Sequence, residues 1–205
     1  MRDADNNTLE KLLGIAKAEF LEKGFPAASL RSIVKKAGVT TGAFYGYFKS
    51  KEELFDALVR EQYDTLMGMY RETQEAFTRL SPEEQMAQMG VQSGDCLRRM
   101  MEYAYANRDS FRLLLCCSEG TRYENMIHEM VEIEVDATHA FAEVMKRLGH
   151  AGYELDPTLE HILVSGLFSA FFEMIIHDIP YEKATDYLRE LREFYTAGWK
   201  RIMGF

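Results

Sequence analysis

A short run of hydroxyl and phenol side chains stands out within the first fifty residues of the chain. It consists of Thr40, Thr41, Gly42, Tyr45 and Tyr47. Short polar side chains allow a helix to lie deep in the major groove of duplex DNA, and tyrosine hydroxyls can reach phosphate oxygens. These residue types at this spacing therefore predict contact with nucleic acid.

Basic residues surround this run. Residues 23–51 contain six Lys or Arg and no Asp or Glu, a local charge of +6 in a chain whose formal net charge is −9. Phosphate contacts supply most of the non-specific affinity for DNA and require such a surplus. Lys49 and Lys51 flank a helix start at Ser50, where free amides and the positive helix end predict a phosphate clamp.

Two short helices are expected to position these groups. The first has one apolar stripe at helical spacing, formed by Leu30, Ile33, Val34 and Ala37. Ser29 is its expected N-cap, and Gly38 ends it in the left-handed conformation that glycine adopts cheaply. Thr40 then caps a second helix whose Phe44 and Phe48 face the first. This is a helix-turn-helix pattern, and an amphipathic helix from Thr8 to Lys23 completes a three-helix head.

The run GVTTGAFYGYFKSKEELF and the amphipathic helix before it resemble the tetracycline-repressor (TetR) family of bacterial transcriptional regulators. The resemblance is motif-specific over about residues 8–58. It implies that Arg31, together with Thr40, Thr41, Gly42 and Tyr45, approaches DNA bases or backbone. Tyr47 and Lys51 would then hold phosphates. The implied fold is all-α, with a head at residues 1–50, a ligand-binding and dimerisation body at residues 51–205, and about nine helices.

The charge is divided unevenly between these two parts. Residues 1–51 hold nine Lys or Arg and five Asp or Glu, a charge of +4, whereas residues 52–205 hold 15 and 28, a charge of −13. The first part can face DNA and the second repels it. The polar start MRDADNN lacks the apolar segment of a secretory signal, and the most apolar run, residues 162–176, is shorter than the roughly 20 residues of a membrane span. We expect a cytoplasmic protein without membrane contact.

Methionines and aromatic residues are frequent between residues 67 and 145. Methionine adapts its shape and recurs at promiscuous binding surfaces, although a packed core is the more frequent use of any single one. With the family resemblance, this predicts an effector cavity lined by Met67, Met100, Tyr103, Phe111, Met126, Met130 and Phe171. The acidic body suggests a lipophilic, cationic effector.

No metal or other cofactor is predicted. His128, Glu132, Asp136 and His139 fall on one helix face, but a solvated polar face explains them better than a metal site. Cys116 and Cys117 are interpreted as small buried hydrophobic residues rather than as a redox or metal sensor.

The two carboxy-terminal helices are expected to form a four-helix bundle with their copies in a second subunit, as the resemblance implies. The helix from Thr158 to His177 is apolar on nearly every side, so it must be buried on more than one. The predicted dimer interface comprises Leu167, Phe168, Phe172, Leu191, Phe194, Tyr195 and Gly198. Burial within one subunit is the alternative.

The leading hypothesis is a ligand-responsive repressor of transcription that binds a palindromic DNA operator as a homodimer and leaves it when a small lipophilic effector binds. Two alternatives remain: a helical adaptor that recruits a protein, and an enzyme with an unrecognised small-molecule site. The chain lacks a glycine-rich phosphate loop, CxxC, GxSxG and zinc-protease motifs, so we expect no enzyme. An adaptor would leave the basic run unexplained.

Overall fold

The computed structural model describes residues 2–149 and 155–204 of the chain, and these residues form ten α-helices and no strand. The all-α prediction is confirmed. The helix count differs from the expected nine because the single helix expected from Ser81 to Ala106 is two helices. Gly90, with φ of 76°, separates α5 (Pro82–Gln88) from α6 (Val91–Ala106).

The chain divides into two compact units. The head unit comprises residues up to Asp64 together with Asn107–Glu124, and the body unit comprises Thr65–Ala106 and the chain from Asn125 onward. The boundary expected between residues 50 and 51 divides the predicted DNA-binding part from the predicted ligand-binding part, and it does not coincide with the division into compact units. As a functional boundary it stays a prediction. The helix α4 (Lys51–Thr78) contributes residues to both units.

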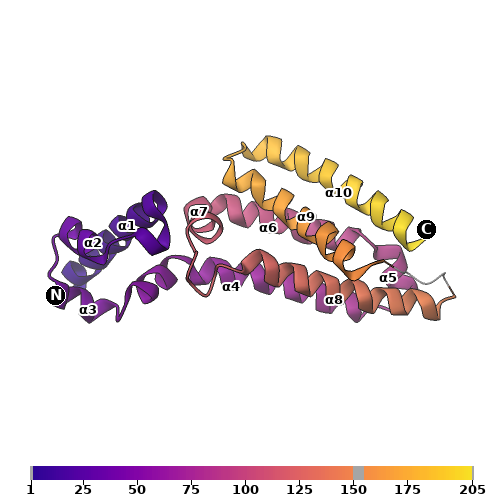
Figure 1. Ribbon diagram of the computed structural model, residues 1–205, viewed down its shortest axis with the longest axis horizontal. Helices are drawn as coiled ribbons and strands as arrows, with labels where there is room; N and C mark the ends of the chain where they lie inside the picture. The colour runs from indigo at the N-terminus through magenta and orange to yellow at the C-terminus, as the bar shows by residue number, and fades with distance from the viewer. Residues whose placement is uncertain (1, 150–154, 205) are drawn as a thin grey trace. The chain divides into compact units, whose positions relative to one another are not determined.

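The head unit contains α1 (Arg2–Ala27), α2 (Leu30–Ala37), α3 (Thr41–Tyr47), the first part of α4 and α7 (Arg108–Cys116) (Figure 1). The expected caps are confirmed: the Ser29 hydroxyl accepts from the Ser32 amide, Gly38 is left-handed, and the Thr40 hydroxyl accepts from the Ala43 amide. α1 begins before the cap expected at Thr8, and its regular geometry is interrupted at Gly24, where φ is 72°.

An aromatic cluster holds the head unit together. The Phe20 and Phe55 rings meet edge to face with centroids 5.1 Å apart, and Phe25 lies 5.8 Å from Phe20 and 5.4 Å from Phe55. The segment after α7 joins this cluster, because Tyr123 is buried and the Phe25 amide donates to the Cys117 carbonyl oxygen at 2.9 Å. The head unit therefore includes a segment far outside the first fifty residues.

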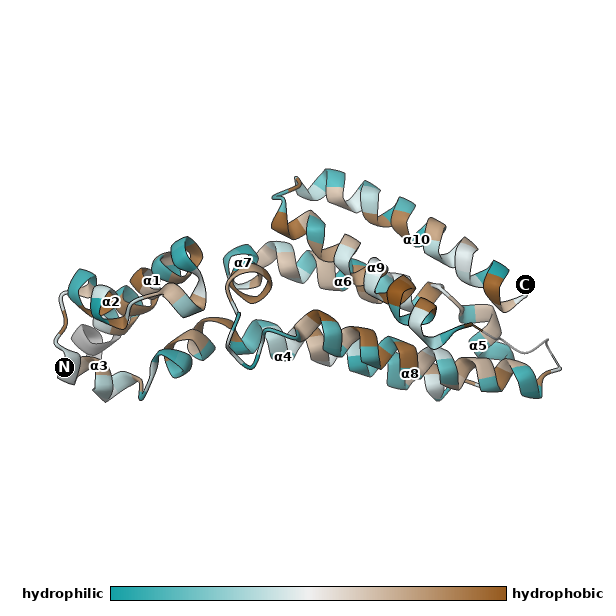
Figure 2. Cartoon of the chain, in the orientation of Figure 1, coloured by the Kyte–Doolittle hydropathy of each residue, from teal (hydrophilic) through white to brown (hydrophobic). Residues whose placement is uncertain are grey.

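The body unit contains the rest of α4, α5, α6, α8 (Met126–Arg147), α9 (Pro157–Ile176) and α10 (Tyr181–Met203). α9 packs against both α8 and α10. Hydrophobic residues are spread along α9 (Figure 2), and its length and composition alone would suffice to cross a membrane. Seven of its residues are nevertheless buried in the body unit. The absence of membrane contact stays a prediction.

Close contacts fix α10 against its neighbours at glycines. A Cβ added at Gly166 of α9 would lie 2.6 Å from the Tyr195 hydroxyl of α10, and one added at Gly94 of α6 would lie 1.7 Å from Nη2 of Arg192. Real Cβ atoms do not approach other atoms this closely. These glycines therefore allow α10 side chains to lie directly on the backbones of α6 and α9.

Candidate DNA interface and ligand cavity

The exposed side of α3 carries the groups predicted to contact DNA. Thr41, Gly42 and Tyr45 are exposed, with 55% of the Tyr45 surface accessible, while Phe44 and Phe48 are buried as expected. Thr40 is exposed as well, but its hydroxyl oxygen is used as the helix cap. Tyr47 is half-buried. The assignment of these residues to DNA stays a prediction.

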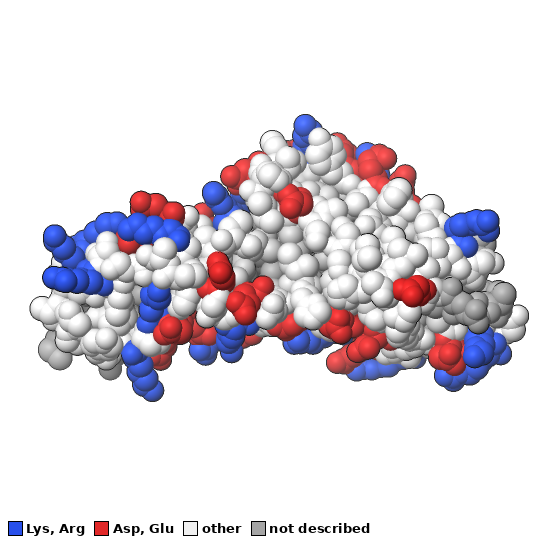
Figure 3. Space-filling model, viewed as in Figure 1, with Lys and Arg blue, Asp and Glu red and all other residues white. Residues whose placement is uncertain are grey.

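The six basic residues between positions 23 and 51 differ in what they contact. Arg31, Lys35 and Lys49 are exposed, and their side chains make no ion pair within the part of the chain that the structure describes. On the face shown in Figure 3, Lys and Arg side chains gather on the head unit. These three cations are available to phosphates.

Lys23 and Lys36 are instead paired with a buried carboxylate. Their ammonium nitrogens each lie 2.6 Å from an oxygen of Glu19, whose surface is only 1% exposed. Hydrogen bonds from Lys23 and then Lys36 lower the pKa of Glu19 from 4.5 to about 2. This cluster joins α1 to α2, so part of the basic run stabilises the head itself.

The structure gives Lys51 a different partner from the expected phosphate. Its Nζ donates to the carbonyl oxygens of Phe25, Pro26 and Ala28 at 2.7, 3.3 and 3.2 Å, and it lies 4.4 Å from the centroid of the Phe25 ring. An ammonium has three donors, and all three have acceptors here. Contact between Lys51 and a phosphate would require these bonds to break.

The start of α4 also satisfies its own groups. The Ser50 hydroxyl oxygen accepts from the Glu53 amide at 3.2 Å, and the Glu53 carboxylate accepts from the Lys49 amide. The pKa of Glu52 is lowered, chiefly by a hydrogen bond from its own backbone amide. Carboxylates therefore occupy the helix end that we expected to be open to a phosphate.

A cavity of about 140 Å³ lies within the body unit. Its walls come from α4, α5, α6, α8, α9 and α10, and the apolar part of the lining includes Phe77, Leu97, Phe141, Leu167, Phe168 and Trp199. None of the seven residues predicted to line an effector cavity lines this one, so their assignment to effector binding stays a prediction. Tyr103 is half-buried, and the other six are buried core residues: Met67, Met100, Phe111, Met126, Met130 and Phe171.

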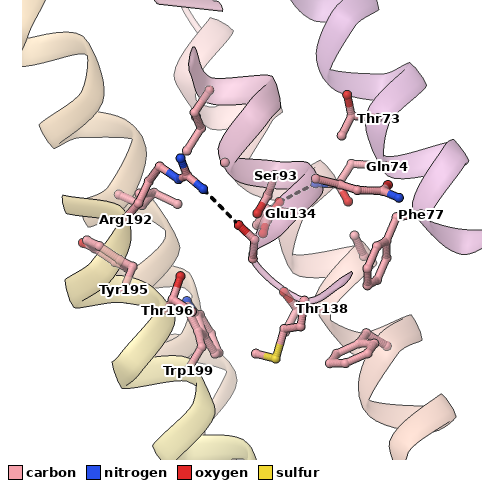
Figure 4. Close-up of a pocket in the computed structure, with 18 of the residues that line it drawn as sticks. Thr73, Gln74, Phe77, Ser93, Glu134, Thr138, Arg192, Tyr195, Thr196 and Trp199 are labelled. Carbon is pink, nitrogen blue, oxygen red and sulfur yellow. Dashed lines mark hydrogen bonds between the residues drawn. The ribbon is translucent and has the colours of Figure 1, made fainter. Parts of the chain in front are cut away.

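Two polar groups in the cavity were not anticipated from the sequence (Figure 4). On the α8 side, the Glu134 carboxyl accepts hydrogen bonds from the Tyr70 hydroxyl and, at 2.6 Å, from the Gln74 amide. Burial raises the pKa of Glu134 above its ordinary value, although these two bonds oppose the shift. Burial also raises the pKa of Tyr70, and the neighbouring Glu134 adds to this effect.

The second polar group is Arg192 of α10. Its Nη2 donates to the Gly90 carbonyl oxygen at 3.4 Å, and its Nε is buried without a hydrogen-bond partner. Arg192 makes no ion pair with any residue that the structure describes. The sequence offered one signal for this site, the pair Gly90 and Gly94, but it did not show which distant side chain lies over them.

The structure also corrects part of the predicted dimer interface. Phe168 and Phe172 are 1% and 0% exposed within one subunit, so neither can face a partner. Leu167 and Tyr195 line the cavity. Phe194 is 73% exposed, Gly198 is exposed and Leu191 is half-buried, so these three remain candidates. Ile162, which is 58% exposed on α9, is a further candidate that was not among the predicted residues.

The polar face of α8 does not assemble a metal site. Glu132 lies 4.0 Å from His128 and 3.6 Å from His161, whereas His139 pairs with Glu160 at 2.7 Å. Within the described residues, no group of three or more His, Cys, Asp or Glu side chains is placed to hold a metal ion. Cys117 is buried as expected, but Cys116 is exposed.

This geometry defines a class: an all-α protein with a helix-turn-helix head and a helical body that encloses a cavity. Residues 12–58 match the family model for bacterial regulatory proteins of the tetR family. This match lies on the sequence motif that carries the resemblance, in the head of the chain.

Curated relatives match part of the chain. The HTH-type transcriptional repressor KstR2 of Mycolicibacterium smegmatis is 31% identical over 88 residues, which are 43% of this chain and 42% of the relative. KstR2 of Rhodococcus jostii is 42% identical over 62 residues, 30% of each chain. The matches therefore span less than half the length of these relatives.

The fold likeness extends further along the chain. A transcriptional regulator from Aquifex aeolicus VF5 aligns with a TM-score of 0.53 at 24% identity, covering 92% of this chain and 99% of its own. The FadR fatty acid degradation regulator of Bacillus halodurans aligns with a TM-score of 0.56 at 16% identity over 92% and 98%. At these identities the likeness concerns the fold.

Proposed function

We propose that this chain is a ligand-responsive transcriptional regulator that binds a palindromic DNA operator as a homodimer and represses transcription until a small effector binds. The observation that carries the proposal is the exposed face of α3, whose hydroxyl and phenol groups stand in one head unit with three cations that have no described ion-pair partner. A bacterial regulator of this kind acts on DNA in the cytoplasm and is no enzyme.

In the proposed complex, α3 lies in the major groove with its N-terminal end toward the bases. Thr41 and Gly42 present no bulk at this end, which permits close approach, and Tyr45 reaches the backbone. Arg31, Lys35 and Lys49 neutralise phosphates around the groove. Positioning by these phosphate contacts and selection by α3 are separate contributions, so they can be tested separately.

The homodimer places two such heads about 34–36 Å apart, on successive major grooves of a near-palindrome. Exposed apolar residues on the carboxy-terminal helices support this assembly: Leu159 and Ile162 on α9, and Tyr187, Phe194 and Ile202 on α10. The chain has a mass of 23.7 kDa. Light scattering should therefore give about twice that mass, and Phe194→Ala should shift the species toward monomer.

Effector binding is coupled to the head through one continuous helix and one connecting segment. α4 begins at Lys51 in the head unit and supplies Tyr70, Gln74 and Phe77 to the cavity wall. The head segment Asn107–Glu124 connects α6 to α8, both of which line the cavity. These helices can adopt one arrangement that binds DNA and another that does not. An effector that binds the second arrangement more tightly lowers the affinity for DNA, by at most the ratio of its own affinities for the two arrangements.

Selection of bound duplexes from a random pool tests the proposal. Enrichment of a palindrome would give the operator and its symmetry together, and affinity for that operator should fall linearly with the logarithm of salt concentration. A variant with Thr41→Glu in the exposed start of α3 is the control that should lose selection while retaining its helical content. If no duplex is enriched and no salt-sensitive binding occurs at low salt, the chain is not a DNA-binding regulator.

A further inference from the structure

The charge of Arg192 has no counterion in the cavity. A guanidinium stays protonated in proteins, so its charge cannot be relieved by losing a proton. The Gly90 carbonyl accepts one long hydrogen bond at 3.4 Å, Nε has no partner, and no described carboxylate lies within ion-pair distance. A partly buried charge without a counterion is costly, and a bound anion would remove part of this cost.

Arg192 is partly buried, and its guanidinium packs against the backbone of α6. The guanidinium lies so close to α6 that a Cβ at Gly94 would fall 1.7 Å from Nη2 and 2.0 Å from Cζ. Figure 4 shows the side chain extending from α10 toward the Gly90 carbonyl, among the residues that line the cavity. The terminal nitrogens therefore form a fixed fork whose geometry matches a carboxylate.

The acidic group of the cavity is already satisfied from within the protein. Glu134 receives hydrogen bonds from Tyr70 and Gln74, and burial raises the pKa of this carboxyl. A carboxyl that is easily neutralised attracts a cation weakly. Arg192 is thus the stronger determinant of ligand charge, which reverses the cationic effector suggested by the acidic composition of the body.

The size and walls of the cavity limit the remainder of the ligand. An apolar protein cavity of about 150 Å³ accommodates benzene, and the cavity here measures about 140 Å³. Phe77, Phe141 and Trp199 supply aromatic surface for an apolar body. One fixed cation balances one negative charge, so a monoanion fits better than a dianion, whose second charge would be buried without a partner.

We propose that the cavity binds a small apolar carboxylate of about the size of one aromatic ring, with its carboxylate held by the terminal nitrogens of Arg192. The regulatory meaning of this binding rests on the proposed function, but the binding itself does not. It can therefore be measured on the full chain without DNA.

The experiment is calorimetric titration of the full chain at pH 7.5 with benzoate, benzamide, benzylamine and phenyl phosphate. These probes share one ring and differ in the charge of the group attached to it. Charge-assisted hydrogen bonds are about twice as strong as neutral ones, so we expect benzoate to bind roughly tenfold to a hundredfold more tightly than benzamide. Benzylamine should bind more weakly than either, and phenyl phosphate more weakly than benzoate.

Three variants locate the charge that discriminates these probes. Arg192→Gln should remove the preference for benzoate over benzamide, and Arg192→Lys should keep part of it because the charge remains without the fork. Gly94→Ala should weaken benzoate binding by displacing the guanidinium while its charge remains. Controls are Arg189→Gln, an exposed arginine of the same helix paired with Asp186, and Gly68→Ala, where an added Cβ meets nothing within 4 Å.

The outcomes separate the inference from the proposed function. The inference is wrong if benzamide binds as tightly as benzoate, if benzylamine binds most tightly, or if no probe binds. It is also wrong if Arg192→Gln keeps both its helical content and the preference for benzoate. None of these results bears on operator selection, which tests the function independently. Benzoate binding without any effect on an operator complex would support the cavity assignment and contradict the regulation.

Discussion

The proposed DNA site of the head and the proposed carboxylate site of the body both rely on basic side chains, but these side chains lie in different environments. In the head unit, Arg31, Lys35 and Lys49 are exposed and have no ion-pair partner among the described residues. In the body unit, Arg192 is partly buried, lines a cavity and packs on the backbone of α6. Full exposure suits a long polyanion, whereas a place in a cavity wall suits one small ligand.

This difference teaches how one chain can hold two anion sites that do not compete. Exposed cations act over about 8–10 Å at ordinary ionic strength, and salt weakens them steadily. A shielded cation is screened less but accepts only what fits its cavity. Salt should therefore separate the two sites, weakening DNA binding much more than carboxylate binding.

The largest expected change in stability comes from truncating a residue that belongs both to the cavity wall and to the core of the body unit. Phe168 is 1% exposed and meets Tyr70 edge to face with centroids 5.4 Å apart. Phe168→Ala should lower the free energy of unfolding by about 3–5 kcal/mol, because it removes a buried ring and enlarges a cavity that the fold cannot close. Urea unfolding monitored by circular dichroism measures this.

Phe194→Ala is the matched control for Phe168→Ala, because Phe194 is 73% exposed. At a concentration where the chain is monomeric, it should change the free energy of unfolding by less than about 0.5 kcal/mol. Equal losses in the two variants would contradict the assignment of Phe168 to the interior of one subunit.

The next effect distinguishes structural from DNA-binding cations within the head. Lys51→Gln should lower the free energy of unfolding by about 1–2 kcal/mol, since charge-assisted bonds to three carbonyl oxygens are lost from a partly exposed site. The salt dependence of DNA binding should stay unchanged. A stable Lys51→Gln protein with a shallower salt slope would show instead that Lys51 holds a phosphate.

A smaller effect should appear at the exposed cations. Arg31→Ala and Lys49→Ala should each reduce the slope of the logarithm of DNA affinity against the logarithm of salt by about 0.9, the contribution of one phosphate contact. Arg192→Gln should leave the slope unaltered. A change in slope in Arg192→Gln comparable with that in Arg31→Ala would remove the distinction between the two anion sites.

The sequence predicts the helices and caps of the head well because these features depend on residues close together in the chain. Ser29, Gly38 and Thr40 lie next to the groups they cap, and Phe44 and Phe48 fall on one side of a helix whatever surrounds it. The carbonyl contacts of Lys51 were not predicted, for the opposite reason. Its carbonyl partners lie 23 to 26 residues earlier, where the interruption of α1 at Gly24 turns the chain.

The cavity depends on pairings that no local pattern specifies. Arg192 and Gly94 are about one hundred residues apart, and only the packing of α10 on α6 brings them together. The apolar residues all around α9 correctly predicted burial on more than one side. These residues could not show which side of α9 packs within its own subunit, because that depends on where α8 and α10 lie against it.

The smallest expected effect concerns the carboxylate that binds two of the head cations. The pKa of Glu19 is lowered from 4.5 to about 2 by hydrogen bonds from Lys23 and Lys36, so its contribution to stability is complete above pH 4.5 and is lost as pH falls toward 2. Glu19→Gln should therefore reduce stability at pH 7, and the difference from the parent chain should shrink between pH 4.5 and 2. Because both lysines are partly exposed and can return to water, the loss should be modest. Urea unfolding at pH 7, 5, 4 and 3 measures this. A difference that is constant over this range would mean that the Glu19 charge does not stabilise the head, and Lys23 and Lys36 would then join the cations available to DNA.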